Sequence, residues 1–140
     1  MRNIKLLLEY DGTAFAGWQV QPEQRTVQGV LESALSQMTG EKVSLIGSGR
    51  TDAGVHASGQ VANFKTETDI PLKAFNEGLN AVLSRDIAVV QAEEADPEFH
   101  ARFGAKSRLY RYQIITRRSP LLERYAWRIL YPLNRDVLLE

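Results

Sequence analysis

Six stretches of the chain carry a regular hydrophobic pattern, and their order along the sequence restricts the fold more than any other feature does. Apolar residues in alternation or in short runs predict strands over residues 4–10, 43–47, 60–65 and 87–92. Apolar residues at helical spacing predict a helix that Thr26 caps and Gly40 ends, and a second helix that Pro71 opens and that extends to Leu83. One sheet and two helices that bury their apolar faces against each other form a two-layer core.

The element order of strand, helix, strand, strand, helix and strand is typical of the ferredoxin-like βαββαβ unit, an α+β fold with an antiparallel sheet. A further strand, predicted over residues 108–116, comes after the Asp-Pro pair at 96–97 and does not belong to that unit. Residues 134–139 have the pattern of the first turns of a helix. We therefore expect a domain over residues 1–96, followed in residues 97–140 by a linker and the first strands of a second, truncated domain. On this interpretation the chain is a fragment of a longer protein.

The composition excludes several classes of chemistry. Of the 140 residues, 44% are hydrophobic and 24% are charged, as in ordinary globular domains. The chain has no cysteine, which excludes disulfides, thiol catalysis and cysteine-bound zinc and agrees with a reducing cytoplasm, so we expect a cytoplasmic protein. No apolar run approaches the length needed to span a membrane. The two histidines, His56 and His100, lie far apart in the sequence, and we expect neither a metal site nor a cofactor.

Charge is distributed unevenly along the chain, although the formal net charge is zero. Residues 1–100 contain 8 Lys or Arg against 14 Asp or Glu, whereas residues 101–140 contain 9 against 3. Aromatic side chains are interleaved with the basic ones of the second stretch, among them Tyr110, Tyr112 and Trp127. Basic side chains bind phosphates and aromatic rings stack on bases, so this segment suits a nucleic acid. A solvated strand-and-loop surface explains the same pattern, and the sequence leaves both interpretations open.

The loop Gly47–His56, with the sequence GSGRTDAGVH, places one carboxylate, Asp52, between an arginine and several glycines. Glycines allow sharp turns and the close approach of a ligand, and an ionised aspartate can act as a nucleophile or a base. Arg50 is expected to hold the negative charge of Asp52 through an ion pair. The loop is not a P-loop, because Val55 and His56 replace the required Lys and Ser/Thr, and it lacks the third glycine of a dinucleotide fingerprint. An aspartate that organises a tight turn explains the same residues.

Two pairs of aromatic residues allow two interpretations each. Phe15 and Trp18, in the segment DGTAFAGWQVQP, either form a stacking platform for a ligand or fill the core under a loop, which is the more common fate of such side chains. Tyr110 and Tyr112 lie two residues apart on a predicted strand and therefore share a face. That face is either part of the core or turned to a ligand.

Three blocks of this sequence carry a resemblance to a known family. They are YDGTAFAGWQVQ at residues 10–21, GSGRTDAGVHASGQV at residues 47–61 and FHARFGAKSRLYRY at residues 99–112. Together they resemble the tRNA pseudouridine synthase A family, and the RTDAGVH segment at Arg50–His56 is highly specific. The resemblance runs through essentially the whole chain. Because the family has two related α/β domains with an RNA-binding cleft between them, the resemblance implies that this chain supplies the first domain and the opening of the second.

The resemblance implies an enzyme that isomerises uridine to pseudouridine in the anticodon arm of tRNA, at positions 38, 39 and 40. Asp52 is then the catalytic nucleophile, Arg50 helps to open the stem, and Tyr110 stacks on the target base. Such an isomerisation requires a nucleophile, positioning and proton transfers, and no cofactor. From charge alone we assign further contacts with the RNA backbone to Arg102, Lys106, Arg108 and Arg111.

The resemblance also carries expectations about assembly and completeness. The family commonly works as a homodimer with tRNA crossing both subunits, so we expect a homodimer. Its members carry, beyond residue 140 of this sequence, a basic residue that faces the aspartate and an apolar residue near the base. We therefore expect the 140 residues alone to have little or no synthase activity.

Two other functions compete with this one. A non-catalytic RNA-binding module of the RRM type also has a ferredoxin-like fold, but its glycine-aromatic signature is absent from the four predicted strands. A ligand-binding regulatory domain leaves the basic, aromatic segment after residue 100 unexplained. Replacement of Asp52 by asparagine or alanine separates these functions, because an enzyme would then lose pseudouridine formation and still bind tRNA.

Overall fold

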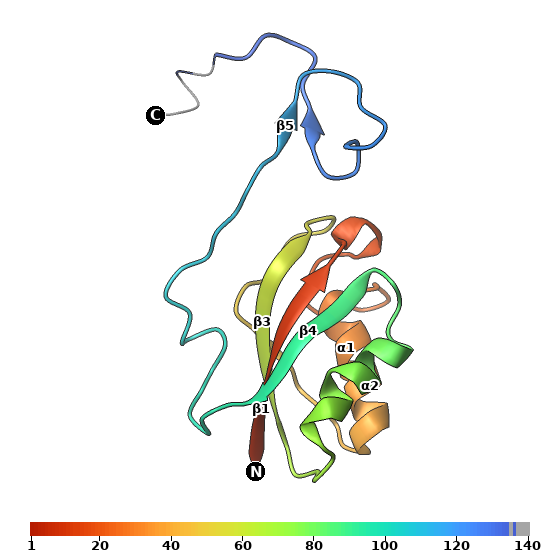
Figure 1. Cartoon of the computed structure of the whole chain (residues 1–140), viewed down its shortest axis with the longest axis vertical. Coiled ribbons are helices and arrows are strands. Elements are labelled where there is room, and N and C mark those ends of the chain that lie inside the picture. The colour runs from red at the N-terminus through yellow and green to blue at the C-terminus, as the bar shows by residue number, and fades with distance from the viewer. Residues whose placement is uncertain (135, 137–140) are drawn as a thin grey trace. The chain divides into compact units, whose positions relative to one another are not determined.

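The computed structural model describes residues 1–134 and 136, and it separates into two compact units (Figure 1). The first unit is Met1–Ser107, and the second begins at Arg108. In the described part of the chain, no helix is long and apolar enough to cross a membrane. That the second unit is the start of another domain stays a prediction.

The first unit consists of a four-stranded antiparallel sheet and two helices. Its strands, in the order β2-β3-β1-β4, are β1 (Arg2–Tyr10), β2 (Ile46–Gly47), β3 (Ala57–Thr66) and β4 (Ile87–Glu94). Helices α1 (Val27–Thr39) and α2 (Glu77–Val82) cover the same face of this sheet (Figure 1). The strand order and the two layers confirm the predicted ferredoxin-like α+β fold.

Helix α1 begins and ends where the sequence predicts. The Thr26 side chain accepts a hydrogen bond from the backbone N–H of Gly29 (3.1 Å), which satisfies a donor that the first turn leaves unpaired. Gly40 ends the helix in the left-handed conformation (φ +72°), which a glycine adopts without steric cost. Local sequence therefore defines both ends of this helix.

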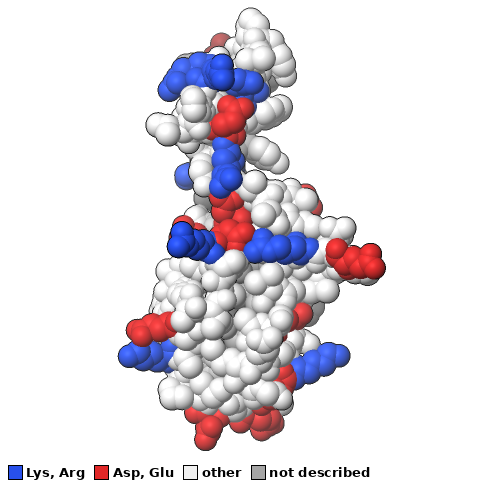
Figure 2. Space-filling view, turned by 90° about the vertical axis from the view of Figure 1, so that its right-hand side faces the viewer, with Lys and Arg blue, Asp and Glu red and all other residues white. Residues whose placement is uncertain are grey.

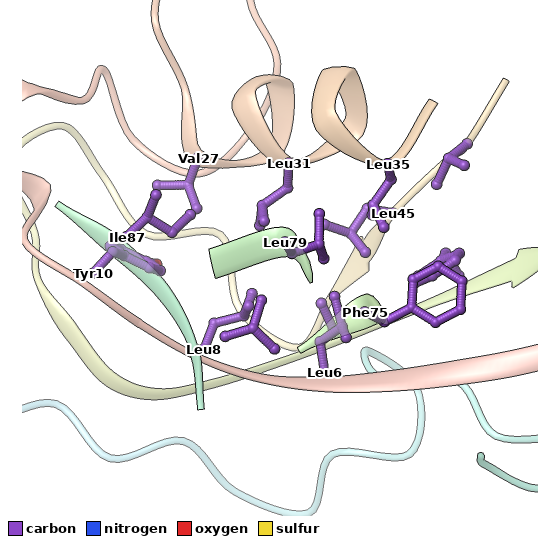
Figure 3. Packing of buried hydrophobic residues seen from close by; sticks show 14 of the residues in the cluster. Leu6, Leu8, Tyr10, Val27, Leu31, Leu35, Leu45, Phe75, Leu79 and Ile87 are labelled. Atoms are coloured by element: carbon purple, nitrogen blue, oxygen red, sulfur yellow. The ribbon is translucent and has the colours of Figure 1, made fainter. Parts of the chain in front are cut away.

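The core lies between the sheet and the helices. Figure 3 shows Leu31 and Leu35 of α1 and Leu79 of α2 on the side of β1 that carries Leu6 and Leu8. All five side chains are fully buried, and burial of each stabilises the fold by about 2 kcal/mol. This core gives the loops at the ends of the strands a rigid support.

The strand predicted over residues 43–47 is shorter than expected, because side chains of α1 take the hydrogen bonds of its first half. The backbone N–H of Leu45 donates to Glu32 Oε2 (3.0 Å), and the Leu45 carbonyl accepts from Gln28 Nε2 (3.1 Å). These bonds replace the pairing with β3, so that β2 retains two residues.

The second predicted helix is divided in two. A 3-10 turn, η2 (Leu72–Phe75), comes first, and α2 begins after Asn76, whose backbone (φ −109°, ψ −78°) departs from helical geometry. The break changes the phase of the helix. Phe75 is fully buried, but Val82, predicted on the apolar side, is 68% exposed.

The segment after β4 packs back on the sheet. Asn3 Nδ2 donates to the Phe99 carbonyl (2.9 Å), and Asn63 Oδ1 accepts from the N–H of Ala101 (2.8 Å). Both asparagines are buried side chains of β1 and β3. Residues 97–107 are therefore part of the first compact unit.

The second unit contains a short parallel pair of strands, β5 (Ile114–Ile115) and β6 (Trp127–Arg128). The strand predicted over residues 108–116 is thus wrong for most of its length. Among the described residues, β6 is the neighbour that pairs with this stretch, and it offers two residues, so the ladder ends there. Tyr110 and Tyr112 are 58% and 82% exposed and do not belong to a core. The helix predicted over residues 134–139 lies outside the described residues except for 134 and 136.

Candidate active site

The loop of residues 48–56 connects β2 to β3, as the sequence predicts, and presents Arg50 and Asp52 to solvent. In the described part of the chain, the Asp52 carboxylate takes part in no hydrogen bond or ion pair. The turn that follows is closed by backbone groups, since the N–H of Val55 donates to the Asp52 carbonyl (3.1 Å). An aspartate that organises a turn would accept such a bond with its carboxylate. The turn-organising interpretation therefore does not describe Asp52.

Gln60, a buried residue of β3, holds the first half of the loop. Its Oε1 accepts hydrogen bonds from Ser48 Oγ (2.7 Å) and from the N–H of Gly49 (3.3 Å), and its Nε2 donates to the Gly49 carbonyl (2.7 Å). One side chain thus binds both backbone groups of Gly49. Because Gln60 is 7% exposed, these bonds are protected from competition by water.

Thr51, the residue before Asp52, is anchored through both its backbone and its side chain. The Thr51 carbonyl accepts from the N–H of Trp18 (2.9 Å), and its Oγ1 lies 2.8 Å from the hydroxyl oxygen of Tyr10. Tyr10 is a buried residue at the end of β1. The backbone next to Asp52 is therefore attached to β1, one of the two central strands of the sheet.

Residues 11–18, here named the arm, run against the loop at backbone-to-backbone distance. A Cβ atom on Gly12 would lie 2.0 Å from the carbonyl oxygen of Val55, and one on Gly17 would lie 2.7 Å from that of Thr51. Gly17 also has a φ of +89°, which other residues rarely adopt. Neither glycine can gain a side chain unless the loop moves.

His56 joins the far end of the loop to the arm. Its Nδ1 accepts a hydrogen bond from the N–H of Gly12 (2.9 Å) and lies 3.3 Å from Asp11 Oδ1. Among the described residues, no group of three or more potential ligands could hold a metal ion. His56 thus makes a structural contact that holds the end of the loop against the arm.

Phe15 and Trp18 fill the core under the loop and form no stacking platform. They are 4% and 2% exposed. Trp18 lies directly on the backbone of Gly47, where a Cβ atom would be 2.6 Å from the indole ring. The structure therefore supports the more common of the two interpretations for these aromatic residues.

An ion pair fastens the chain after the arm to the turn before β4. The Arg25 guanidinium donates to both carboxylate oxygens of Asp86 (2.9 and 3.1 Å) and lies 4.1 Å from the ring centroid of Phe15. The hydrogen bonds from Arg25 lower the pKa of Asp86 and raise the pKa of Arg25. Phe15 is thereby covered on its outer side.

The expected ion pair between Arg50 and Asp52 is not formed. In the part of the chain that the structure describes, neither side chain takes part in an ion pair. Both are exposed, and an exposed pair gains little over the hydration of its two charges. The loop brings the two residues together without joining their side chains.

The other predicted site residues are divided between the two units. Arg102 and Lys106 belong to the first unit, and Arg108, Tyr110 and Arg111 to the second. All five are exposed, and Figure 2 shows Lys and Arg side chains gathered on the second unit. Among the described residues, no hydrogen bond or ion pair links Arg102 or Lys106 to the loop of Asp52.

The residues that hold the loop were missed by the sequence reasoning. Gln60 and Tyr10 had no assigned role, and Gly12 and Gly17 were not recognised as points of close approach. A glutamine inside an otherwise apolar strand was a usable signal, because buried amides require partners. The glycines gave no local signal, since the backbone that they contact lies far away in the sequence.

The comparisons with known proteins agree on one family. A family model described as tRNA pseudouridine synthase matches residues 7–104. The tRNA pseudouridine synthase A of Citrifermentans bemidjiense is 60% identical over 131 residues, which are 92% of this chain and 52% of that protein. Those of Geobacter sp. strain M21 and Thermoanaerobacter sp. strain X514 are 56% and 52% identical over 99% and 96% of this chain, and over 57% and 56% of their own lengths. The chain spans about half the length of these curated relatives, and it belongs to the tRNA pseudouridine synthase family.

Proposed function

We propose that the protein expressed from the whole gene that encodes this chain, named here the gene product, converts uridine to pseudouridine in tRNA. Asp52 is the nucleophile. The observation that carries the proposal is its exposed carboxylate, which accepts no hydrogen bond from the described residues although the backbone around it is anchored. Such a carboxylate is held in place and still available to react.

The reaction is an isomerisation, so the product contains the same atoms as the uridine from which it forms. The bond between ribose C1′ and uracil N1 breaks, the base turns, and C1′ bonds to C5. The proton on C5 leaves, and N1 gains one. A nucleophile and proton transfers are sufficient for these steps. The family match supports this proposal over a non-catalytic RNA-binding module, because the relatives are named as synthases.

Arg50 and Tyr110 act on the RNA next to the target base in this proposal. A base inside a helix must be extruded before it reacts. The exposed Arg50 side chain, two residues from the nucleophile, helps to open the stem, and the exposed ring of Tyr110 stacks on the extruded base. Substitution of Arg50 should slow pseudouridine formation in a tRNA more than in a single-stranded RNA of the same sequence, whereas substitution of Tyr110 should slow it in both.

The contacts with the RNA backbone are proposed to come from exposed basic residues, namely Arg102, Lys106, Arg108 and Arg111. Each lost phosphate contact should reduce the slope of log Kd against log salt by about 0.7 to 0.9. The double substitution of Arg102 and Arg111 by alanine should therefore weaken tRNA binding at low salt and flatten this slope by about 1.5. Arg85→Ala, which removes an exposed arginine outside this segment, is the matched control. An unchanged slope would exclude these two residues from the RNA surface.

The target is proposed to be the anticodon arm, at positions 38, 39 and 40. Incubation of an unmodified tRNA transcript with the gene product should produce pseudouridine at these positions, as mapped by chemical derivatisation and primer extension. A transcript with cytidine at the three positions should stay unmodified. Pseudouridine elsewhere in the tRNA would contradict the proposed target, and its complete absence would contradict the proposed function.

We also propose that the 140 residues alone are not a complete enzyme, and that the gene product is a homodimer located in the cytoplasm. The 140 residues assayed alone should form little or no pseudouridine, because the relatives are about twice as long. The gene product should have the mass of a homodimer in light scattering. It should be recovered in the cytoplasmic fraction of its cells.

A further inference from the structure

The amide of Gln60 uses every hydrogen-bonding position that it has. Its oxygen accepts from Ser48 Oγ and from the N–H of Gly49, and its nitrogen donates to the Gly49 carbonyl and to the Tyr10 hydroxyl (3.5 Å). A backbone N–H can donate but not accept, and a carbonyl can accept but not donate. The amide therefore has a single orientation that satisfies all of its partners.

The contacts of Gln60 extend through Tyr10 to Thr51. Gln60 Nε2 donates to the Tyr10 hydroxyl oxygen, and this hydroxyl shares a hydrogen bond with Thr51 Oγ1 at 2.8 Å. The Tyr10 ring is 3% exposed and packs against Trp18, with ring centroids 6.4 Å apart. The hydroxyl of Tyr10 is thus a fixed point in the core.

We infer that Gln60 and Tyr10 are positioning residues for Asp52, an inference that rests on the proposed function. Gln60 holds Gly49 and Tyr10 holds Thr51, and these two residues lead directly into Asp52. Both side chains are buried beneath the loop, so they act through its backbone and do not touch the substrate. The central strands β1 and β3 thereby determine where the nucleophile stands.

The expected effect is on the rate of the chemical step. A displacement of a reacting group by about 1 Å costs on the order of 100-fold in rate. Gln60→Met removes all four hydrogen bonds with little change in volume, and Tyr10→Phe removes one hydroxyl and leaves the ring in place. The affinity for tRNA depends on other residues and should stay the same in both variants.

The test measures single-turnover pseudouridine formation and tRNA affinity in variants of the gene product. We expect the rate to fall about 10- to 100-fold in Gln60→Met and about 10-fold in Tyr10→Phe, with Kd within about twofold of the wild type. Thr51→Val should have the effect of Tyr10→Phe. The double variant Tyr10→Phe/Thr51→Val should be no slower than either single variant, because both substitutions remove the same hydrogen bond between residues 10 and 51.

Asn80 offers a matched control. Its amide also binds both backbone groups of one residue, Val89, at 2.8 Å each, but it joins α2 to β4 and is not part of the loop network. Asn80 is exposed, so Asn80→Leu should lower the melting temperature less than Gln60→Met does, and it should leave the single-turnover rate unchanged. A role that is merely structural would give the two amide variants the same rate.

The outcomes separate the inference from the proposed function. Wild-type rates in Tyr10→Phe and Gln60→Met would overturn the inference, as would a fall in rate that Asn80→Leu shares. If Gln60→Met does not fold, Tyr10→Phe and Thr51→Val decide the question. An inactive wild-type gene product would contradict the proposed function instead.

Discussion

Replacement of Gly12 by alanine should reduce pseudouridine formation by the gene product at least about 100-fold and destabilise the first unit by about 3 kcal/mol. The new methyl group would lie 2.0 Å from the carbonyl oxygen of Val55 and 2.6 Å from its carbon. Both atoms belong to the backbone and cannot rotate away as a side chain can. The arm and the loop must therefore move apart. This movement breaks the hydrogen bond from the Gly12 N–H to His56 Nδ1.

Thermal unfolding and single-turnover kinetics of the Gly12→Ala variant check this expectation. The melting temperature should fall by roughly 10 °C. Gly78→Ala is the matched control, because its methyl group meets the flexible Met38 side chain at 3.4 Å inside helix α2, where alanine is preferred to glycine. That control should be as stable as the wild type or slightly more stable, with an unchanged rate. A Gly12→Ala variant with wild-type stability and rate would show that the arm does not constrain the loop.

The fold was predictable wherever neighbouring residues determine the structure. Thr26 and Gly40 delimit α1 through contacts with residues of the same helix, and the buried residues Ile4, Leu6 and Leu8 of β1 alternate along the strand as one face of a sheet requires. The position of Asp52 on a loop between two strands followed from the same local patterns. Element order then left few ways to arrange one sheet and two helices.

The parts that were not predictable depend on partners far along the chain. Leu45 leaves the sheet ladder because Glu32 and Gln28 of α1 bind its backbone groups. Gly12 meets Val55, more than forty residues away. Neither contact has a signature within a short window of sequence, so the length of β2 and the close approach of the arm to the loop are not predictable from local patterns.

The strand over residues 108–116 illustrates a different reason. Its tyrosines and isoleucines have high strand propensity, but a strand exists through a neighbour that completes its hydrogen bonds. Within the described residues, β6 supplies this neighbour for Ile114–Ile115. Propensity without a partner therefore predicted more strand than the second unit contains.

Replacement of Asp52 by asparagine should abolish pseudouridine formation, with a fall in rate of at least about 10⁴-fold. Asparagine has the shape of aspartate, but its neutral amide is not a nucleophile. Stability should change by less than about 0.5 kcal/mol, because the side chain is exposed and the described residues give its carboxylate no partner. Asp52→Ala should have the same effect. It serves as a control because deamidation of the introduced asparagine would regenerate the aspartate, whereas alanine cannot revert in this way. Asp69→Asn, which neutralises another exposed aspartate of the first unit, should retain the wild-type rate.

The role of Asp52 as the nucleophile is tested by single-turnover conversion of unmodified tRNA. The rate and the tRNA affinity are measured for the wild-type gene product and for Asp52→Asn. We expect pseudouridine in the anticodon arm with the wild type and none with Asp52→Asn, at equal tRNA affinity. Pseudouridine formed by Asp52→Asn and by Asp52→Ala at the wild-type rate would contradict this role.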